Sequence, residues 1–159
     1  MRLYAPEYYK DFQCIKDKCT HSCCIGWEID VDELTRARYL ECNDAYARAI
    51  CDSIDEDSEC GVSHFRMGED GRCPHLTEDG LCRIIIELGE DYLADICREH
   101  PRFYNITPHG AEVGLGAACE EACRIILTSD SYIKIIEIGE TDGKCTDSKF
   151  DTAGERESI

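Results

Sequence analysis

The sequence contains few basic residues and no long apolar segment. Lys and Arg number 17 against 34 Asp and Glu, which leaves a formal net charge of −17 at pH 7. Proteins that bind nucleic acid or anionic membrane surfaces use Lys and Arg to neutralise phosphates, so this balance argues against both kinds of partner. Apolar runs such as 84–86 and 125–127 are far shorter than the roughly 18 residues of a membrane span. We therefore expect a protein that binds neither nucleic acid nor a membrane.

The first ten residues, MRLYAPEYYK, also lack the apolar core of about 7 to 15 residues that marks a secretory signal. This absence favours a reduced, cytoplasmic compartment. Cysteine, in contrast, is abundant, with 13 residues in a chain of 159. In a reduced compartment such a count indicates metal ligation rather than disulfides, and an odd number of cysteines would leave one thiol unpaired. Buried free cysteine is the third interpretation for individual positions.

The cysteines at the start of the chain are closely spaced. Cys14, Cys19, Cys23 and Cys24 form the pattern C-x4-C-x3-C-C. The adjacent Cys23 and Cys24 cannot form a disulfide with each other without severe strain. Thiolates this close together repel one another unless a cation holds them, and iron or zinc is the usual cation. The spacing predicts a metal centre and leaves iron and zinc open.

Periodicity predicts a single α+β domain with a metal-organised core, mostly short helices and a small antiparallel hairpin. The domain is expected over 1–138, with a polar tail over 139–159. Residues 1–29 read as irregular, and Asp30 reads as the cap of a first helix. The other expected elements are helices up to residue 50 with a break at 42–44, helices at 84–88, 92–100 and 119–127, a hairpin-like part over 64–82 with turns at 68–71 and 78–80, and strands at 113–115 and 132–138.

A series of motifs follows the same order as in a known family. The motifs are Phe12-x-Cys14, Cys19-x3-Cys23-Cys24-x2-Trp27, Gly71-x-Cys73-Pro74-x-Leu76, Glu78-Asp79-Gly80-Leu81-Cys82-x-Ile84, Leu88-Gly89-Glu90, Cys97-x3-Pro101-Arg102 and Cys119-x-Glu121-Ala122. In this order they resemble the FliB-type flagellin lysine-N-methylases and, more distantly, cysteine-cluster proteins named for zinc or iron chelation. The resemblance runs from about Phe12 to Leu127. Family members continue well past the end of this chain, which reads as a short or truncated member.

The resemblance implies a cytoplasmic bacterial enzyme that uses S-adenosylmethionine to methylate lysine side chains of flagellin. It also implies an iron–sulfur cluster, of the 4Fe-4S type. The cysteines at family positions are Cys14, Cys19, Cys23, Cys24, Cys73, Cys82, Cys97 and Cys119. One such cluster takes four thiolates, so either two centres exist or some of these eight cysteines serve packing. Cys42, Cys51, Cys60, Cys123 and Cys145 have no family counterpart and are interpreted as structural.

Two features bear on the methyl donor. The radical pattern C-x3-C-x2-C is absent, because Gly26 and Ile126 occupy the third position of the two near matches. Residues 112–118 read E-x-G-x-G-x-A ahead of a predicted helix, which makes Gly114 and Gly116 weak candidates for binding a nucleotide-like donor. The alternative, which we favour, is a glycine-rich turn that leads Cys119 into the metal site.

Other side chains near the cysteines have two interpretations each. His21, His75 and His100 are either zinc ligands or partly exposed or helix-terminal histidines. Arg98, Arg102 and Arg124 offer contacts to the cluster or donor, or surface salt bridges, which we favour. Trp27 is expected to cover the metal. As alternatives to the methylase, we consider a nonenzymatic zinc- or iron-binding module and, third, a disulfide-stabilised protein.

Overall fold

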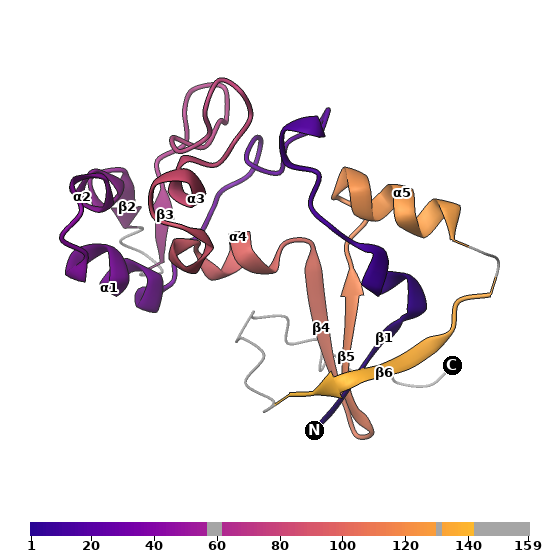
Figure 1. Cartoon of the computed structure of the whole chain (residues 1–159). Coiled ribbons are helices and arrows are strands. Elements are labelled where there is room, and N and C mark those ends of the chain that lie inside the picture. Colours follow the sequence, from indigo (N-terminus) through magenta and orange to yellow (C-terminus); the bar gives the residue numbers. More distant parts are fainter. Residues whose placement is uncertain (57–61, 130–131, 142–159) are drawn as a thin grey trace, which may run out of the picture.

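The computed structural model describes residues 1–56, 62–129 and 132–141. One side of the molecule carries α1 to α4 with a two-stranded sheet, and the other carries a four-stranded sheet with α5 (Figure 1). The predicted class of short helices with a small antiparallel sheet is confirmed, while a metal-organised core is not established by these contacts. None of the helices in the described ranges is long and apolar enough to cross a membrane.

The four-stranded sheet joins the two ends of the described chain. Its strands are β1 (Arg2–Pro6), β4 (Arg102–Thr107), β5 (Gly110–Leu115) and β6 (Ile135–Glu140), in the order β4-β5-β1-β6. β1 pairs parallel with β5 and antiparallel with β6. The expectation that residues 1–29 are irregular was therefore wrong for β1. β5 confirms the strand expected at 113–115, and β6 continues two residues beyond the expected domain end at 138; residues 142–159 lie outside the described ranges.

Helix α5 (Glu120–Thr128) follows β5 and buries Ala122 and Ile125. Its residues contact η1 (Glu7–Asp11), the 3-10 turn after β1. A second 3-10 turn, η2 (Lys16–Lys18), lies in the cysteine-rich segment that passes the beginning of α5 (Figure 1). The predicted helix at 119–127 is thus confirmed within one residue at each end, and Cys119 sits at its N-cap position.

Two aspartates define the first two helices. The Asp32 side chain accepts a hydrogen bond from the backbone N–H of Thr35 and begins α1 (Glu33–Glu41). Asp44 accepts from the Tyr46 N–H and begins α2 (Ala45–Cys51). The predicted break at 42–44 is confirmed. The predicted cap at Asp30 was wrong by two residues, because Asp30 instead forms a bridge with His64.

The hairpin expected over 64–82 is only partly confirmed. β3 (Ser63–Phe65) pairs antiparallel with β2 (Ile54–Glu56), which lies upstream of the expected hairpin. The turns are as expected: the Gly71 N–H donates to the Gly68 carbonyl at 2.8 Å, and the Gly80 N–H donates to Thr77 at 3.0 Å. Residues 72–76 form isolated bridges rather than a strand.

The chain after this turn region forms three short helical segments. They are α3 (Arg83–Glu87), the 3-10 turn η3 (Glu90–Tyr92) and α4 (Asp95–Glu99). The helix expected at 92–100 is thus shorter and begins later, because Leu93 and Ala94 are extended.

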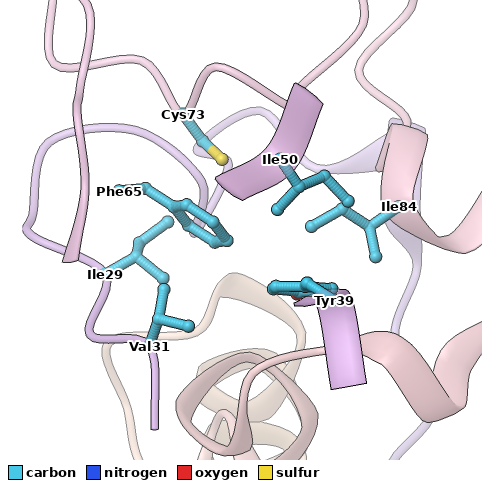
Figure 2. Packing of buried hydrophobic residues seen from close by; sticks show 7 residues of the cluster. All are labelled: Ile29, Val31, Tyr39, Ile50, Phe65, Cys73 and Ile84. Atoms are coloured by element: carbon cyan, nitrogen blue, oxygen red, sulfur yellow. The ribbon is translucent and has the colours of Figure 1, made fainter. Parts of the chain in front are cut away.

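The helical side of the molecule has one hydrophobic core. Its buried members are Ile29, Val31, Tyr39, Ile50, Phe65, Cys73 and Ile84 (Figure 2). They come from several segments between Ile29 and Ile84, so packing rather than local sequence joins them. A thiol is among them, and the candidate site begins there.

Candidate metal centre

Four of the family-position cysteines share this core. Cys73 is 7% exposed and belongs to the buried cluster, and Figure 2 shows its side chain pointing into it. Cys24, Cys82 and Cys97 are partly buried and pack against the same cluster. We call Cys24, Cys73, Cys82 and Cys97 the core thiol group. All four cysteines therefore border the same hydrophobic core, which they reach from four separate segments.

Backbone pairing fixes the positions of three of these cysteines. The Cys73 N–H donates to the Cys24 carbonyl at 2.9 Å, and an isolated bridge joins Ile25 to Arg72 beside it. The chain reverses direction in the tight turn after Leu76, so that Leu76 and Cys82 form another isolated β-bridge. Cys97 lies on α4, and its backbone N–H donates to the Ala94 carbonyl at 2.9 Å. The core thiol group therefore sits on a hydrogen-bonded frame.

The surroundings of the core thiol group disfavour the thiolate form of Cys73, Cys82 and Cys97. Burial raises the pKa of Cys73 to about 11 and also raises the pKa of Cys82. Burial raises the pKa of Cys97 further, and negative charge at the other three cysteines adds to it. A hydrogen bond from Cys23 lowers the pKa of Cys24 to about 7, with help from Ser22 and Arg72. A bound cation would reverse this penalty, because thiolates that repel one another are stabilised by a shared positive charge.

A second set of family cysteines lies at the beginning of α5, away from the core. Burial raises the pKa of Cys19, and negative charge on Cys14, Glu120 and Cys119 raises it further. We call Cys14, Cys19 and Cys119 the outer thiol group; Cys14 is exposed and the other two are partly exposed. A hydrogen bond with the adjacent Cys24, together with burial, raises the pKa of Cys23, and negative charge on Cys14 and Cys97 adds to this shift.

The donor chemistry of both groups suits a thiophilic metal such as iron or zinc. In the described part of the chain, however, no three or more His, Cys, Asp or Glu side chains are arranged closely enough to hold a metal ion. Side chains of the core group would have to turn towards a common point to form a complete site. Metal ligation by the eight family cysteines thus stays a prediction.

The histidine next to Cys73 has a structural role. His75 is 5% exposed, and both ring nitrogens are occupied: Nδ1 pairs with the Tyr46 hydroxyl at 3.0 Å, and Nε2 pairs with the Ser53 hydroxyl at 2.9 Å. Its ring meets Phe65 edge-on with centroids 4.8 Å apart. Burial lowers the pKa of His75 to about 4, with a smaller contribution from the positive charge of Arg83. The structure therefore places His75 as a neutral core residue and contradicts a partly exposed histidine.

The other two histidines differ in their surroundings. The exposed His21 ring contacts Thr20 at 3.1 Å and lies 3.8 Å from a Glu120 oxygen. The His100 ring packs against Trp27, with centroids 5.8 Å apart, and its buried Nε2 has no hydrogen-bond partner among the described residues. The Trp27 indole donates to the Cys23 carbonyl and packs against the core. Trp27 therefore lies beside Cys23, and its expected role as the cover of a metal stays a prediction.

The arginines follow the salt-bridge interpretation in two cases of three. Arg98 pairs with Asp95, and Arg124 pairs through two nitrogens with Glu121, at 2.7 and 2.6 Å. Arg102 instead donates from Nε to the Tyr9 hydroxyl at 3.0 Å and lies over the rings of Tyr9 and Phe12. Arg102 thus anchors the segment that leads to Cys14.

Packing explains the glycine-rich sequence before α5. Gly114 lies within β5 under the Phe103 ring, where an added Cβ would lie 2.3 Å from a ring carbon. The Gly116 N–H donates to the Pro101 carbonyl at 2.7 Å. β1 is parallel to β5 and antiparallel to β6, so β5 and β6 run in opposite directions. The segment β5–α5–β6 is therefore not a parallel βαβ unit. The donor-binding role of Gly114 and Gly116 stays a prediction without geometric support.

Of the cysteines interpreted as structural, Cys51 packs against the core, and the Cys42 thiol is hydrogen-bonded to Tyr92. Cys123 lies on α5, and its N–H donates to the Cys119 carbonyl at 2.8 Å. Cys60 and Cys145 lie outside the described residues.

Comparison with known proteins decides the family. Two proteins named lysine-N-methylase, from Salmonella choleraesuis and Salmonella typhimurium, are each 30% identical to the chain over 138 residues. FliU of Salmonella muenchen, named a flagellar biosynthetic protein, is 33% identical over 137 residues, which cover 83% of this chain and 80% of FliU. The chain belongs to the FliB-type family.

This FliB-type chain covers only 34% of the length of the two lysine-N-methylases. It matches FliU over most of both sequences. No family model and no solved structure matches the chain. The comparisons therefore establish kinship, while the activity of the longer relatives enters below as a proposal.

Sequence reasoning missed several residues that shape the site. The hydroxyls of Tyr46 and Ser53 form hydrogen bonds with the His75 ring, and the Thr20 hydroxyl donates a hydrogen bond to Glu120, which lies 100 positions later in the chain. No spacing rule links such pairs, because the partners lie far apart in the chain. The one available signal was Thr20 directly after Cys19 and Glu120 directly after Cys119.

Proposed function

We propose that this FliB-type protein binds a metal through its core thiol group and takes part in the N-methylation of lysine side chains on a protein substrate. The observation that carries the proposal is the convergence of Cys24, Cys73, Cys82 and Cys97 on one core. The names of the two lysine-N-methylase relatives support the reaction class.

The core thiol group contains four cysteines, which is the number of thiolate ligands that one 4Fe-4S cluster would take. Such a cluster would supply electron-transfer or Lewis-acid chemistry when bound. The chain's own residues would hold it and exclude water: Trp27, Ile96 and Leu88 pack around the same core. Zinc, bound by the same four sulfurs, is the alternative metal.

The methyl donor and the substrate follow from the resemblance and the relatives' names. S-adenosylmethionine would give its methyl group to the neutral ε-amine of a lysine: a carbon–nitrogen bond forms, the sulfur–carbon bond breaks, and the amine releases a proton. Flagellin is the proposed substrate, supported by the name of FliU as a flagellar protein. The net charge of −17 is favourable for approach of a lysine-bearing protein.

A second candidate function is a nonenzymatic metal-binding module of the cytoplasm. It is favoured by one observation: the chain covers 34% of the lysine-N-methylases but 80% of FliU, whose name carries no activity. The active site of the longer relatives could lie in the part that this chain does not match.

A methyl-transfer assay separates the two functions. Full-length, anaerobically purified protein is incubated with flagellin monomers and S-adenosylmethionine labelled in its methyl group, and mass spectrometry locates labelled lysines. We expect donor-dependent labelling that Cys73→Ser abolishes and Cys123→Ser leaves intact. Metal bound by the wild-type protein without any labelling would favour the nonenzymatic module. Labelling that survives in Cys73→Ser would contradict a role for the core thiol group.

A further inference from the structure

A small cavity lies on the sheet side of the molecule, where η1 meets the end of α5 and the beginning of β6. Its volume is about 280 Å³. Glu7, Tyr8 and Asp11 line it from η1, and Tyr132 and Lys134 line it from the chain after α5. We call it the η1–α5 cavity. Sites for small molecules and cofactors usually measure about 300–1,000 Å³, so this cavity is better suited to a single side chain.

The charges around the η1–α5 cavity favour a cation. Glu7 and Asp11 line it, and neither carboxylate forms an ion pair within the described parts of the chain. Among the described lining residues Lys134 is the one basic residue, and its carbonyl accepts the Glu7 backbone N–H at 2.8 Å, which joins the two walls. α5 also ends here at Thr128, and the C-terminal end of a helix carries partial negative charge.

Two tyrosine rings line the same cavity. Tyr8 belongs to η1, and Tyr132, which follows α5, is 88% exposed. The face of a tyrosine ring attracts an ammonium group. The apolar stem of a lysine side chain packs on such a ring while the charged end reaches a carboxylate. Carboxylates and rings together therefore match an alkylammonium group.

Large apolar side chains are exposed beside the cavity. Ile133 lines it and is exposed. Leu127, directly before Thr128, is 77% exposed, and Ile135, directly after Lys134, is 61% exposed. Exposed apolar groups beside a polar site are typical of surfaces that contact another protein. The surroundings thus suit a lysine that is presented by a polypeptide.

We propose that the η1–α5 cavity is a docking site for a lysine side chain of the protein substrate, with the neighbouring apolar side chains in contact with residues next to that lysine. The choice of lysine rests on the proposed function. The cavity lies on the sheet side, whereas the core thiol group borders the core of the helical side (Figure 1). The docked lysine therefore holds the substrate and is distinct from the lysine that is methylated.

Nuclear magnetic resonance titration of the isotope-labelled full-length chain tests the proposal. The probe is a short synthetic peptide with one lysine between apolar residues, and the matched peptide carries acetyl-lysine, which has no charge. We expect the lysine peptide to shift backbone amide signals at 7–11, 127–129 and 132–135. The acetyl-lysine peptide should bind several-fold more weakly, and added salt should reduce the difference.

Five variants separate the contributions of charge and ring. Glu7→Gln and Asp11→Asn should each weaken binding by about two- to fivefold, as expected for exposed charge pairs. Tyr132→Ala should cost a similar factor, while Tyr132→Phe keeps the ring face and most of the affinity. Lys134→Gln removes the competing positive charge and should tighten binding. The side chains at these four positions are exposed, so the fold should tolerate the changes.

Glu140→Gln is the matched control, because it removes the same charge from β6 outside the cavity and should leave the affinity unchanged. Equal binding of the lysine and acetyl-lysine peptides would overturn the proposal. So would signals at 7–11 that shift with protein concentration alone, since a second copy of the chain would then occupy the cavity.

The methyl-transfer assay on flagellin keeps this proposal distinct from the proposed function. Combined Glu7→Gln and Asp11→Asn should raise KM for flagellin and leave kcat unchanged. Methyl transfer by a wild-type protein that binds no lysine peptide overturns the docking site alone. Lysine-peptide binding at the cavity without any methyl transfer contradicts the proposed function and supports the docking site.

Discussion

The backbone N–H of Cys73 donates to the carbonyl of Cys24 at 2.9 Å, which joins the first cysteine segment to the turn region nearly fifty residues later. The adjacent cysteines therefore differ in their surroundings: Cys24 packs against the core that contains Cys73, whereas Cys23 is exposed. This pairing brings Cys24 to the core that Cys73 helps to form.

The buried His75 should make the protein less stable in acid. Its folded pKa of about 4 lies below the usual 6.5, so the folded state holds the neutral ring while the unfolded chain takes up a proton. This contribution is present above pH 6.5 and is lost as the pH falls through about 4, amounting to about 3 kcal/mol. We expect the free energy of unfolding to fall less in His75→Gln than in the wild type when the pH is lowered from 7 to 4.

Urea unfolding at a series of pH values measures this difference. The comparison with the wild type cancels the titration of the carboxylates, which the two proteins share. Parallel stability curves for the two proteins would contradict a buried neutral histidine.

Gly114 should be required by Phe103 rather than by a ligand. A Cβ at position 114 would lie 2.3 Å from the Phe103 ring, so Gly114→Ala must displace that ring. We expect a loss of about 1 kcal/mol, at the low end for overpacking because the 57% exposed ring can move. Phe103→Ala should rescue most of the loss in the double variant, as measured by a denaturant cycle. Additive losses would argue against the packing role.

Arg102 should hold the N-terminal cysteine segment in place. Its guanidinium lies 5.4 Å from the Phe12 ring centre and donates to Tyr9, contacts that suit a planar cation. Arg102→Lys keeps the charge but loses the stacking and the fixed geometry, so amide hydrogen exchange at residues 9–14 should accelerate several-fold. Arg48→Lys, on the exposed face of α2, is the matched control and should leave exchange at 9–14 unchanged.

Local signals in the sequence were enough for several elements. The break at 42–44 is caused by Asp44, whose side chain caps α2, and the turn at 78–80 is held by Thr77 and Gly80. Both depend on residues within four positions of each other. The strand at 113–115 was likewise readable from its apolar residues.

Long-range pairing explains most of what was missed. β1 is short and ends at Pro6, and it is a strand only because β5 and β6, from the far end of the chain, pair with it. β2 lies in an acidic stretch of the sequence, and it is a strand only because β3 pairs with it. The family cysteines were identified by motif, but their arrangement depends on two long-range contacts: the backbone pairing of Cys73 with Cys24 and the hydrogen bond from Thr20 to Glu120.

The most direct test is the metal content of anaerobically purified full-length protein, compared between the wild type, Cys73→Ser and Cys42→Ser. We predict stoichiometric iron with sulfide and absorption near 400 nm, or stoichiometric zinc, in the wild type and in Cys42→Ser. Cys73→Ser should lose the metal of the core thiol group. Metal-free wild-type protein, or unchanged metal content in Cys73→Ser, would contradict the account.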